Sequence, residues 1–176
     1  MEIFTDPRDG KIYNIVVIGE QTWMAQNLDY CGEDGNLGKW YVNDPEYGTK
    51  YGRLYNWFEA KMAVPLGWHL PINKDWQILV DFVGGEKVAG NRLRTKGGWI
   101  NSFHKGTDKY GFSAMPGGIH DTDNTFYLEK ANGYWWAATG NGSKKAWSWS
   151  INYLYSHIYK STRSKETRFS VRCVKS

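Results

Sequence analysis

The sequence has few cysteines, no long apolar run and no strong excess of charge. Its two cysteines, Cys31 and Cys173, stand far apart in a chain of 176 residues, and two are too few to indicate whether the compartment is oxidising. The pair could form a disulfide. A free and buried Cys173 is equally compatible with the sequence, because it follows the alternation of apolar Val171 and Val174 near the end of a predicted strand.

The lack of a long apolar run and the small net charge argue against a membrane-spanning protein and against a nucleic-acid-binding protein. No window of about 18 apolar residues occurs, so we expect no membrane-spanning segment. The opening MEIFTDPRDG lacks the basic, apolar and small-residue zones of a signal peptide, so the protein is either cytoplasmic or exported with a signal outside this sequence. A net charge of +4 is weak for a nucleic-acid-binding protein, and no such partner is expected.

Aromatic residues and glycines are abundant instead. Aromatics make up 16 % of the chain and there are 20 glycines, a composition typical of short strands joined by long loops. The length is that of one domain, residues 1–176, large enough to bury a core. No repeat or linker divides it.

Local patterns predict an α+β fold. They indicate a hairpin at residues 11–28 that turns at Gly19-Glu20, a helix at 53–64, a second helix that ends at Gly84-Gly85, and a final antiparallel sheet that includes a long strand or hairpin and closes at 169–175. Loops are expected at 30–50, anchored by Trp40 and Tyr41, and at 86–110 after a short helical start. Residues 111–118 are expected to form a brief strand.

Apolar spacing predicts which side chains are buried. In the first helix Leu54, Trp57, Phe58 and Met62 recur at helical spacing, and in the second Trp76, Leu79, Val80 and Val83 do so, with Asn73 as the expected N-cap. Large aromatics bury much area, so we also assign to the core Trp23, Trp68, Trp135 and Trp136, together with Leu70.

The last third of the chain, residues 133–176, has a distinct composition. From Asn141 onward it carries eight Lys or Arg and one acidic residue, Glu166, and aromatic residues alternate with Ser, Thr and Asn. Tyr and Trp give large contact areas with few rotatable bonds, and Ser and Asn give adaptable hydrogen bonds, so this mixture favours a recognition surface. The alternative is a core strand followed by a solvated basic loop.

No catalytic or metal-binding motif occurs. The histidines His69, His104, His120 and His157 have no partner at ligand spacing; His69 is expected to pack in the framework and His157 to be exposed and to contact ligand. Residues 121–124, DTDN, lack the glycine and distant glutamate of a calcium loop and are expected to form a solvated turn. The glycines of GFSAMPGG have no phosphate-loop Lys after them. No cofactor and no metal are predicted.

Four segments in register point to a known family. TDPRDGKIYNIVVIGEQTWMAQNL, YGRLYNWFEAKMAVPLGWHLP, GTDKYGFSAMPGG and the closing GYWW…FSVRCVKS resemble the Fibrobacter succinogenes major paralogous domain over nearly the whole chain. The resemblance implies a C-type-lectin-like fold with its termini together, two helices flanking a small sheet, and long loops that present a ligand. It also implies a structural hydrogen-bond role for Arg53 and Arg172.

The resemblance further implies a surface protein with a variable region. Members are usually exported, lipid-anchored or pilus-associated, and some are the variable proteins of diversity-generating retroelements, in which adenine-containing codons of the C-terminal segment are rewritten. Framework positions that match the family are Tyr134, Trp135, Trp136, Ala146, Ile151, Tyr153, Ile158 and 171–173. At Arg168 the family commonly has Gly, so a required glycine φ would strain this turn.

The residues between the framework positions form the predicted ligand-binding set. These are Lys144, Lys145, Ser148, Trp149, Asn152, Leu154, Tyr155, His157, Tyr159, Ser161, Thr162 and Arg163. Trp149, Tyr155, His157, Tyr159 and Arg163 are the preferred contacts.

We therefore expect a non-enzymatic, monomeric recognition domain of a bacterial surface protein or adhesin. Its ligand would be a protein or a carbohydrate. One alternative is a structural or assembly module of a pilus or surface layer. Another is an enzyme related to formylglycine generation, which shares the fold and needs reactive cysteines in a groove.

Overall fold

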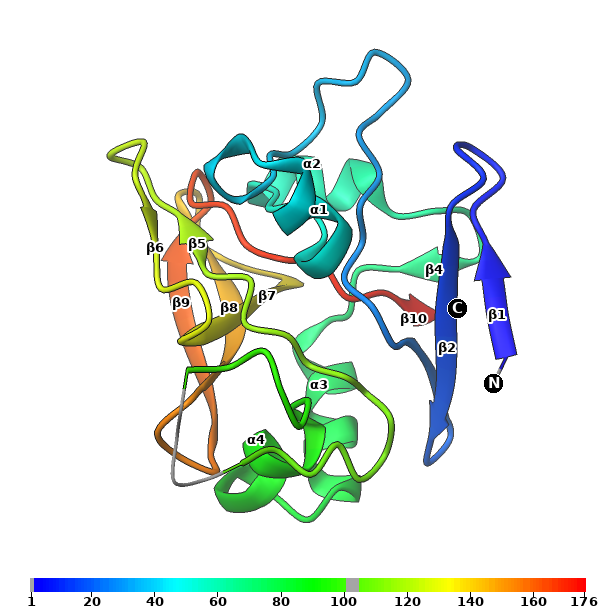
Figure 1. Ribbon diagram of the computed structural model, residues 1–176, viewed down its shortest axis with the longest axis vertical. Coiled ribbons are helices and arrows are strands. Elements are labelled where there is room, and N and C mark those ends of the chain that lie inside the picture. Colours follow the sequence, from blue (N-terminus) through cyan, green and yellow to red (C-terminus); the bar gives the residue numbers. More distant parts are fainter. Residues whose placement is uncertain (1, 101–104) are drawn as a thin grey trace.

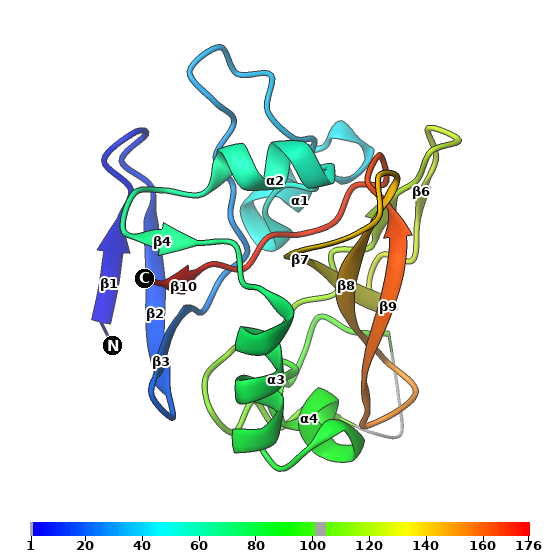
Figure 2. The same cartoon turned by 180° about the vertical axis from the view of Figure 1, so that it is seen from behind.

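The computed structural model describes residues 2–100 and 105–176, and its fold is α+β (Figure 1). The helices are α1 (Pro45–Tyr51), α2 (Trp57–Ala63), α3 (Asn73–Phe82) and α4 (Glu86–Leu93). The strands are β1 (Glu2–Thr5), β2 (Ile12–Ile18), β3 (Gln21–Met24), β4 (Trp68–His69), β5 (Ile119–His120), β6 (Phe126–Tyr127), β7 (Asn132–Asn141), β8 (Lys145–Asn152), β9 (Ile158–Ser164) and β10 (Val174–Lys175). The helices lie between two separate sheets, α1 and α2 at one end and α3 and α4 at the other (Figures 1 and 2).

The first sheet joins the two ends of the chain. It has five antiparallel strands in the order β1-β2-β3-β10-β4, and Val174 of β10 pairs with Trp23 on one side and His69 on the other. The predicted hairpin at 11–28 is confirmed as β2 and β3. The closing strand is shorter than predicted, because Phe169 and Ser170 form only isolated bridges to Tyr55 and Trp135.

The second sheet is formed by residues 132–164, most of the C-terminal third. Its antiparallel order is β7-β8-β9, which confirms the predicted hairpin in this region. Successive side chains of a strand point to opposite faces. On one face Trp135 and Trp149 pack against Trp76 of α3, and on the other face Tyr134 and Trp136 pack against Phe169. The sheet therefore separates two hydrophobic clusters.

Helix α3 has the predicted buried stripe. Trp76, Leu79, Val80 and Val83 are all fully buried, and positive φ values at Gly84 and Gly85 end the helix. The N-cap is Ile72 rather than Asn73. Asn73 is already helical, its side chain accepts a hydrogen bond from Trp149 Nε1 (3.1 Å), and Asp75 Oδ2 accepts from the Ile72 N–H (2.8 Å).

Helix α2 buries a different face from the predicted one. Asn56 and Glu59 cap its N-terminus reciprocally, and the buried residues are Trp57, Ala60 and Ala63. The predicted burial of Phe58 and Met62 is wrong, since they are 48 % and 70 % exposed. Two alanines allow the helix to approach the core closely, so the larger apolar side chains face outward. The predicted core positions of Trp23, Trp68, Leu70, Trp135 and Trp136 are confirmed.

The two loop regions differ in their agreement with prediction. Residues 30–50 contain α1, which was not predicted, although Asp44 as N-cap and Pro45 at the first turn are ordinary helix-start signals. Trp40 and Tyr41 anchor this region as expected: Tyr41 is buried and Trp40 Nε1 donates to Asp29 Oδ1 (2.7 Å). Helix α4 is the expected helical start of 86–110. The brief strand at 111–118 is absent apart from one bridge, Arg94 to Ala114.

Candidate functional site

The candidate site is the C-terminal face, by which we mean the exposed side chains of residues 144–164, from the turn before β8 through the loop 153–157 to the end of β9, on both sides of their sheet. Strand β8 lies in the middle of the three-stranded sheet and β9 at its edge (Figure 1). The sheet is held from within by Ile151 and Ile158, which oppose each other and are both buried. A rigid framework thus carries the exposed residues.

Two of the predicted contact residues are not exposed. Trp149 is fully buried, stacks on Trp76 with a centroid distance of 6.0 Å, and donates its indole N–H to Asn73. Ser148 is also fully buried and faces Ser161 of β9 (3.4 Å). Their expected exposure is wrong because β8 is a central strand with both faces covered.

The exposed predicted residues lie mainly on β9 and the preceding loop. Leu154, Tyr155 and Tyr159 are 46 %, 53 % and 39 % exposed. Lys144, Lys145 and Arg163 are exposed as well, whereas His157, Ser161 and Thr162 are half-buried, so the expectation that His157 is exposed holds only in part.

Asn152 has a structural role at this face. Its Oδ1 accepts hydrogen bonds from the backbone N–H groups of Leu154 and Tyr155, both at 3.0 Å, and its carbonyl accepts one from Arg94 Nη1 (2.6 Å). Such an Asx turn fixes the start of the loop. Asn152 therefore positions the two exposed apolar side chains.

Ring contacts order the side chains of β9. His157 and Tyr159 stack at a centroid distance of 5.9 Å and an interplanar angle of 22°. The Lys160 ammonium lies over the Trp147 ring (4.7 Å) and near the Trp149 ring (5.6 Å), a cation–π arrangement. Lys160 and Trp147 were not in the predicted set. Only the cross-strand register, which pairs Lys160 with Trp149, brings them together.

The face is basic. Lys144, Lys145, Lys160 and Arg163 are exposed, and none of them forms an ion pair within residues 2–100 and 105–176. Glu166 is the one acidic residue from Asn141 onward in the sequence. The C-terminal face therefore carries both exposed aromatic or apolar groups and uncompensated cations, which suits a ligand that carries negative charge.

Comparison with known proteins shows the family to which the chain belongs. The family model of the Fibrobacter succinogenes major domain matches residues 16–175. The chain belongs to this family. No curated protein and no solved structure matches it significantly. None of the described helices is long and apolar enough to cross a bilayer.

The expected role of two arginines in the Fibrobacter succinogenes major domain is confirmed. Arg172 is fully buried and donates to the carbonyls of Met24, Phe112 and Ser113 and to the side chain of Asn27. Burial lowers the pKa of its guanidinium to about 9.

Arg53 has the same kind of role nearer the surface. It donates to the Gly38 carbonyl (3.3 Å), pairs with Asp29 (3.3 Å) and covers the Trp40 ring.

Arg168, at the position where the family commonly has Gly, adopts no positive φ. Its side chain pairs with Glu59 and its backbone bonds to His120 in both directions. The turn is therefore not strained by the missing glycine, and Arg168 ties the C-terminal segment to α2 and β5.

The two described histidines outside the face, His69 and His120, make hydrogen bonds within the fold. His69, expected to pack in the framework, does so only in part: its side chain is 40 % exposed, and its ring links Asp75 Oδ2 (3.2 Å) with Ser176 Oγ (3.1 Å). Buried His120 packs against the Phe126 ring at a tilt of 39° and bonds to Asn124 Oδ1 (3.0 Å). His104 lies outside the described residues.

The DTDN segment forms a hydrogen-bonded turn. Asp121 Oδ1 accepts from Thr167 Oγ1 (3.1 Å), and Asp123 accepts from the Thr125 N–H (2.9 Å) and the Tyr127 hydroxyl (2.5 Å). Its oxygens therefore have protein donors. In the described part of the chain no three His, Cys, Asp or Glu residues lie together as a potential metal site.

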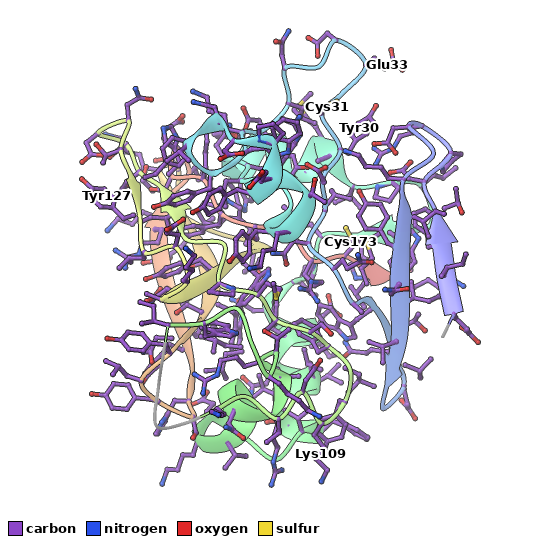
Figure 3. All side chains as sticks on the ribbon, in the orientation of Figure 1. Tyr30, Cys31, Glu33, Lys109, Tyr127 and Cys173 are labelled. Carbon is purple, nitrogen blue, oxygen red and sulfur yellow. The ribbon has the colours of Figure 1, made fainter. Side chains whose placement is uncertain are left out.

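The two cysteines are unpaired. Figure 3 shows Cys31 on the loop beyond β3 and Cys173 in the interior beside β10. Burial raises the pKa of the Cys173 thiol to about 12, so this thiol stays protonated near neutral pH. A protonated, inaccessible thiol is a poor nucleophile.

Proposed function

We propose that this domain recognises a ligand, a protein or a glycan, through the C-terminal face. The observation that supports this most directly is the exposure of Tyr155, Tyr159 and Leu154 in the same segment as the exposed, unpaired cations Lys160 and Arg163. Exposed aromatics on a rigid strand lose little conformational entropy on binding, and Arg can pair with a carboxylate or a phosphate. The buried sheet beneath supplies that rigidity.

A substitution experiment tests this function. Wild-type protein is screened on arrays of glycans and bacterial surface proteins, beside the variant Tyr155→Ala with Tyr159→Ala and Arg163→Ala. We expect every genuine ligand to lose at least about tenfold in affinity, as for a hot-spot set worth more than 1.4 kcal/mol. The matched control is Phe58→Ala with Met62→Ala, which removes comparable exposed side chains from α2 and leaves binding intact.

The control also defines the opposing outcome. If ligand binding survives in the first variant and is lost in the α2 variant, the C-terminal face is not the site. Far-UV circular dichroism confirms that both variants remain folded.

We further propose a C-type-lectin-like fold and a location at the cell surface. The antiparallel pairing of β10 with β3 and β4, which brings the two termini to one sheet, supports the fold, as does the placement of helices beside a small second sheet. An experimental structure whose topology matches no C-type-lectin-like protein would refute the fold. Protease shaving of intact source cells tests the location, because a surface domain is cleaved and an internal one is not.

We also propose that the C-terminal face is diversified by a retroelement. The exposed positions of 144–163 carry many residue types on a buried framework, which supports tolerance to change. The test is the DNA downstream of the gene: a near-copy of codons 141–176 that differs only at adenines, beside a reverse transcriptase. Its absence would favour a fixed ligand.

A second candidate function, assembly with another copy, is favoured by the outer side of α2. Phe58 and Met62 of α2 are 48 % and 70 % exposed. In the segment that follows α2, Leu66 and Ile72 are 96 % and 44 % exposed and line a groove together with Val64 and Trp68. Apolar exposure of this kind marks interaction sites. Gel filtration over a concentration series tests it: assembly predicts oligomers that Met62→Glu dissociates, and a monomer at all concentrations rules it out.

A further inference from the structure

Within the described residues no strand pairs with the outer edge of β9, although α4 contacts this strand, whereas the other edge of the sheet is covered. Along β7, Ser170 donates to the Tyr134 carbonyl (3.1 Å) and accepts from the Trp136 N–H (3.3 Å), so the C-terminal segment covers that edge. On β9, Tyr159–Arg163 form backbone hydrogen bonds within the described residues only with β8. Half of the N–H and C=O groups of an edge strand point away from its neighbour. They are available to a further strand.

The side chains of this edge have a defined order. Because side chains alternate along a strand, Lys160 and Arg163, three positions apart, lie on opposite faces of the sheet. Tyr159 precedes the first cation, and Ser161 and Thr162 stand between the two. Lys160 is held over the Trp147 ring. The edge thus presents one cation on each face at a fixed spacing.

We propose that the β9 edge binds an extended acidic segment of a protein partner by strand addition. This proposal rests on the recognition function proposed above and specifies that the ligand is a protein. Main-chain hydrogen bonds supply affinity in strand addition, and alternate side chains supply specificity. The partner carries acidic residues three positions apart, so that one carboxylate meets Lys160 on one face and the other meets Arg163 on the opposite face. The antiparallel orientation is preferred, because its hydrogen bonds are slightly more stable.

Charge disfavours pairing of this edge with another copy of itself. Basic residues on an edge strand disfavour pairing with like-charged strands. They also select a partner of opposite charge, since juxtaposed like charges cost several kcal/mol and complementary ones increase the association rate. With no carboxylate paired to Lys160 or Arg163 in the described residues, their charge is available to the partner.

The test uses the peptide Thr-Glu-Val-Thr-Glu-Val-Thr, labelled with a fluorophore, and fluorescence anisotropy with the whole protein. Two further peptides carry N-methyl groups on alternate residues, in the odd or the even positions. Strand addition requires the amides of one set only, so we expect one methylated peptide to lose at least about tenfold in affinity and the other to bind like the parent. A peptide with its two Glu residues adjacent should bind more weakly.

Charge reversal supplies the second readout. Lys160→Glu with Arg163→Glu should abolish binding of the Glu peptide and allow binding of the Lys-for-Glu peptide. Lys50→Glu with Lys61→Glu, an equal change of charge on α1 and α2, should change affinity less than about twofold at physiological salt, where distant surface charges are screened.

Three results would overturn strand addition: no binding at millimolar peptide, equal binding of both methylated peptides, or binding unaffected by charge reversal on β9. These results leave the recognition function standing if a screened ligand still depends on Tyr155 and Tyr159. If no ligand depends on them while the peptide binds as described, the broader proposal fails and the edge site remains.

Discussion

Asn27→Ala should destabilise the fold more than any surface change, because Asn27 joins the two sheets. Its Oδ1 accepts from Trp135 Nε1 (2.9 Å) and from Nε (3.2 Å) and Nη2 (2.8 Å) of buried Arg172. Its Nδ2 donates to the Tyr51 carbonyl (2.9 Å) and to Ser170 Oγ (3.3 Å). The alanine variant breaks all five hydrogen bonds and leaves a buried cation with fewer acceptors.

The magnitude follows from the types of bond. Hydrogen bonds to a charged group contribute about 1.5–3 kcal/mol and neutral ones about 1 kcal/mol. Counting the two Arg172 contacts as one interaction, and allowing for partial rearrangement of the guanidinium toward its three carbonyl partners, we expect the free energy of unfolding to fall by about 4 kcal/mol. Domains of this kind have about 5–15 kcal/mol in total, so the variant should be marginally stable.

Urea denaturation at pH 7, followed by tryptophan fluorescence, measures this loss. The control is Asn36→Ala, which removes one exposed side-chain bond to Asp34 and should cost less than about 0.5 kcal/mol. The slope of the free energy against urea should be unchanged for both, since the exposed area of the unfolded state is the same. A loss below about 1 kcal/mol for Asn27→Ala would refute the view that this amide is central to the fold.

Three further changes have defined expectations. Trp135→Ala should lower the free energy of unfolding by about 3–5 kcal/mol in the same assay, as for other buried Trp residues, and a loss near zero would contradict its burial. Gly48→Ala should destabilise by about 1–3 kcal/mol, because a Cβ there would overlap the Trp40 indole; an unchanged melting curve would show that the indole moves freely. Burial raises the folded-state pKa of the Cys173 thiol to about 12, so the folded protein keeps this proton at pH values at which the unfolded chain loses it. The contribution of the protonated thiol to stability is therefore complete below about pH 9 and is lost as the pH rises to about 12. Between about pH 9 and 12 the free energy of unfolding should therefore fall less steeply with pH in Cys173→Ala than in the wild type, by up to about 1.4 kcal/mol per pH unit, and equal slopes would refute this. In the folded wild type only Cys31 should react rapidly with a thiol reagent, and two rapidly reacting thiols would contradict the burial of Cys173.

The sequence allowed much of the framework to be predicted. The buried stripe of α3 was predicted correctly because four large apolar side chains recur at helical spacing in that helix. The predicted buried stripe of α2 was wrong because Ala60 and Ala63, which pack against the core, give a weaker apolar signal than the exposed Phe58 and Met62. Spacing reports apolar character, and it does not report how closely a helix approaches its neighbours.

The strands that carry the candidate site were predictable from the sequence, but the exposure of their residues was not. Alternation along 146–160 indicates strands, yet it could not show that β8 is central and β9 is at the edge, and for this reason Trp149 and Ser148 are assigned to the surface from the sequence. Lys160 was missed for the same reason, because its place over Trp147 depends on the register between two strands. Edge and register are properties of the assembled sheet.

The position of β10 between β3 and β4 has a consequence for the order of folding. The hydrogen bond from Arg172 to the Met24 carbonyl joins residues 148 apart in the sequence. Such distant contacts require closure of a very long loop before they contribute energy, and topologies rich in them fold slowly. During synthesis, the hairpin of β2 and β3 therefore keeps one unpaired edge until nearly the whole domain has left the ribosome. The chain should therefore stay open to chaperones or export factors until its last strand arrives.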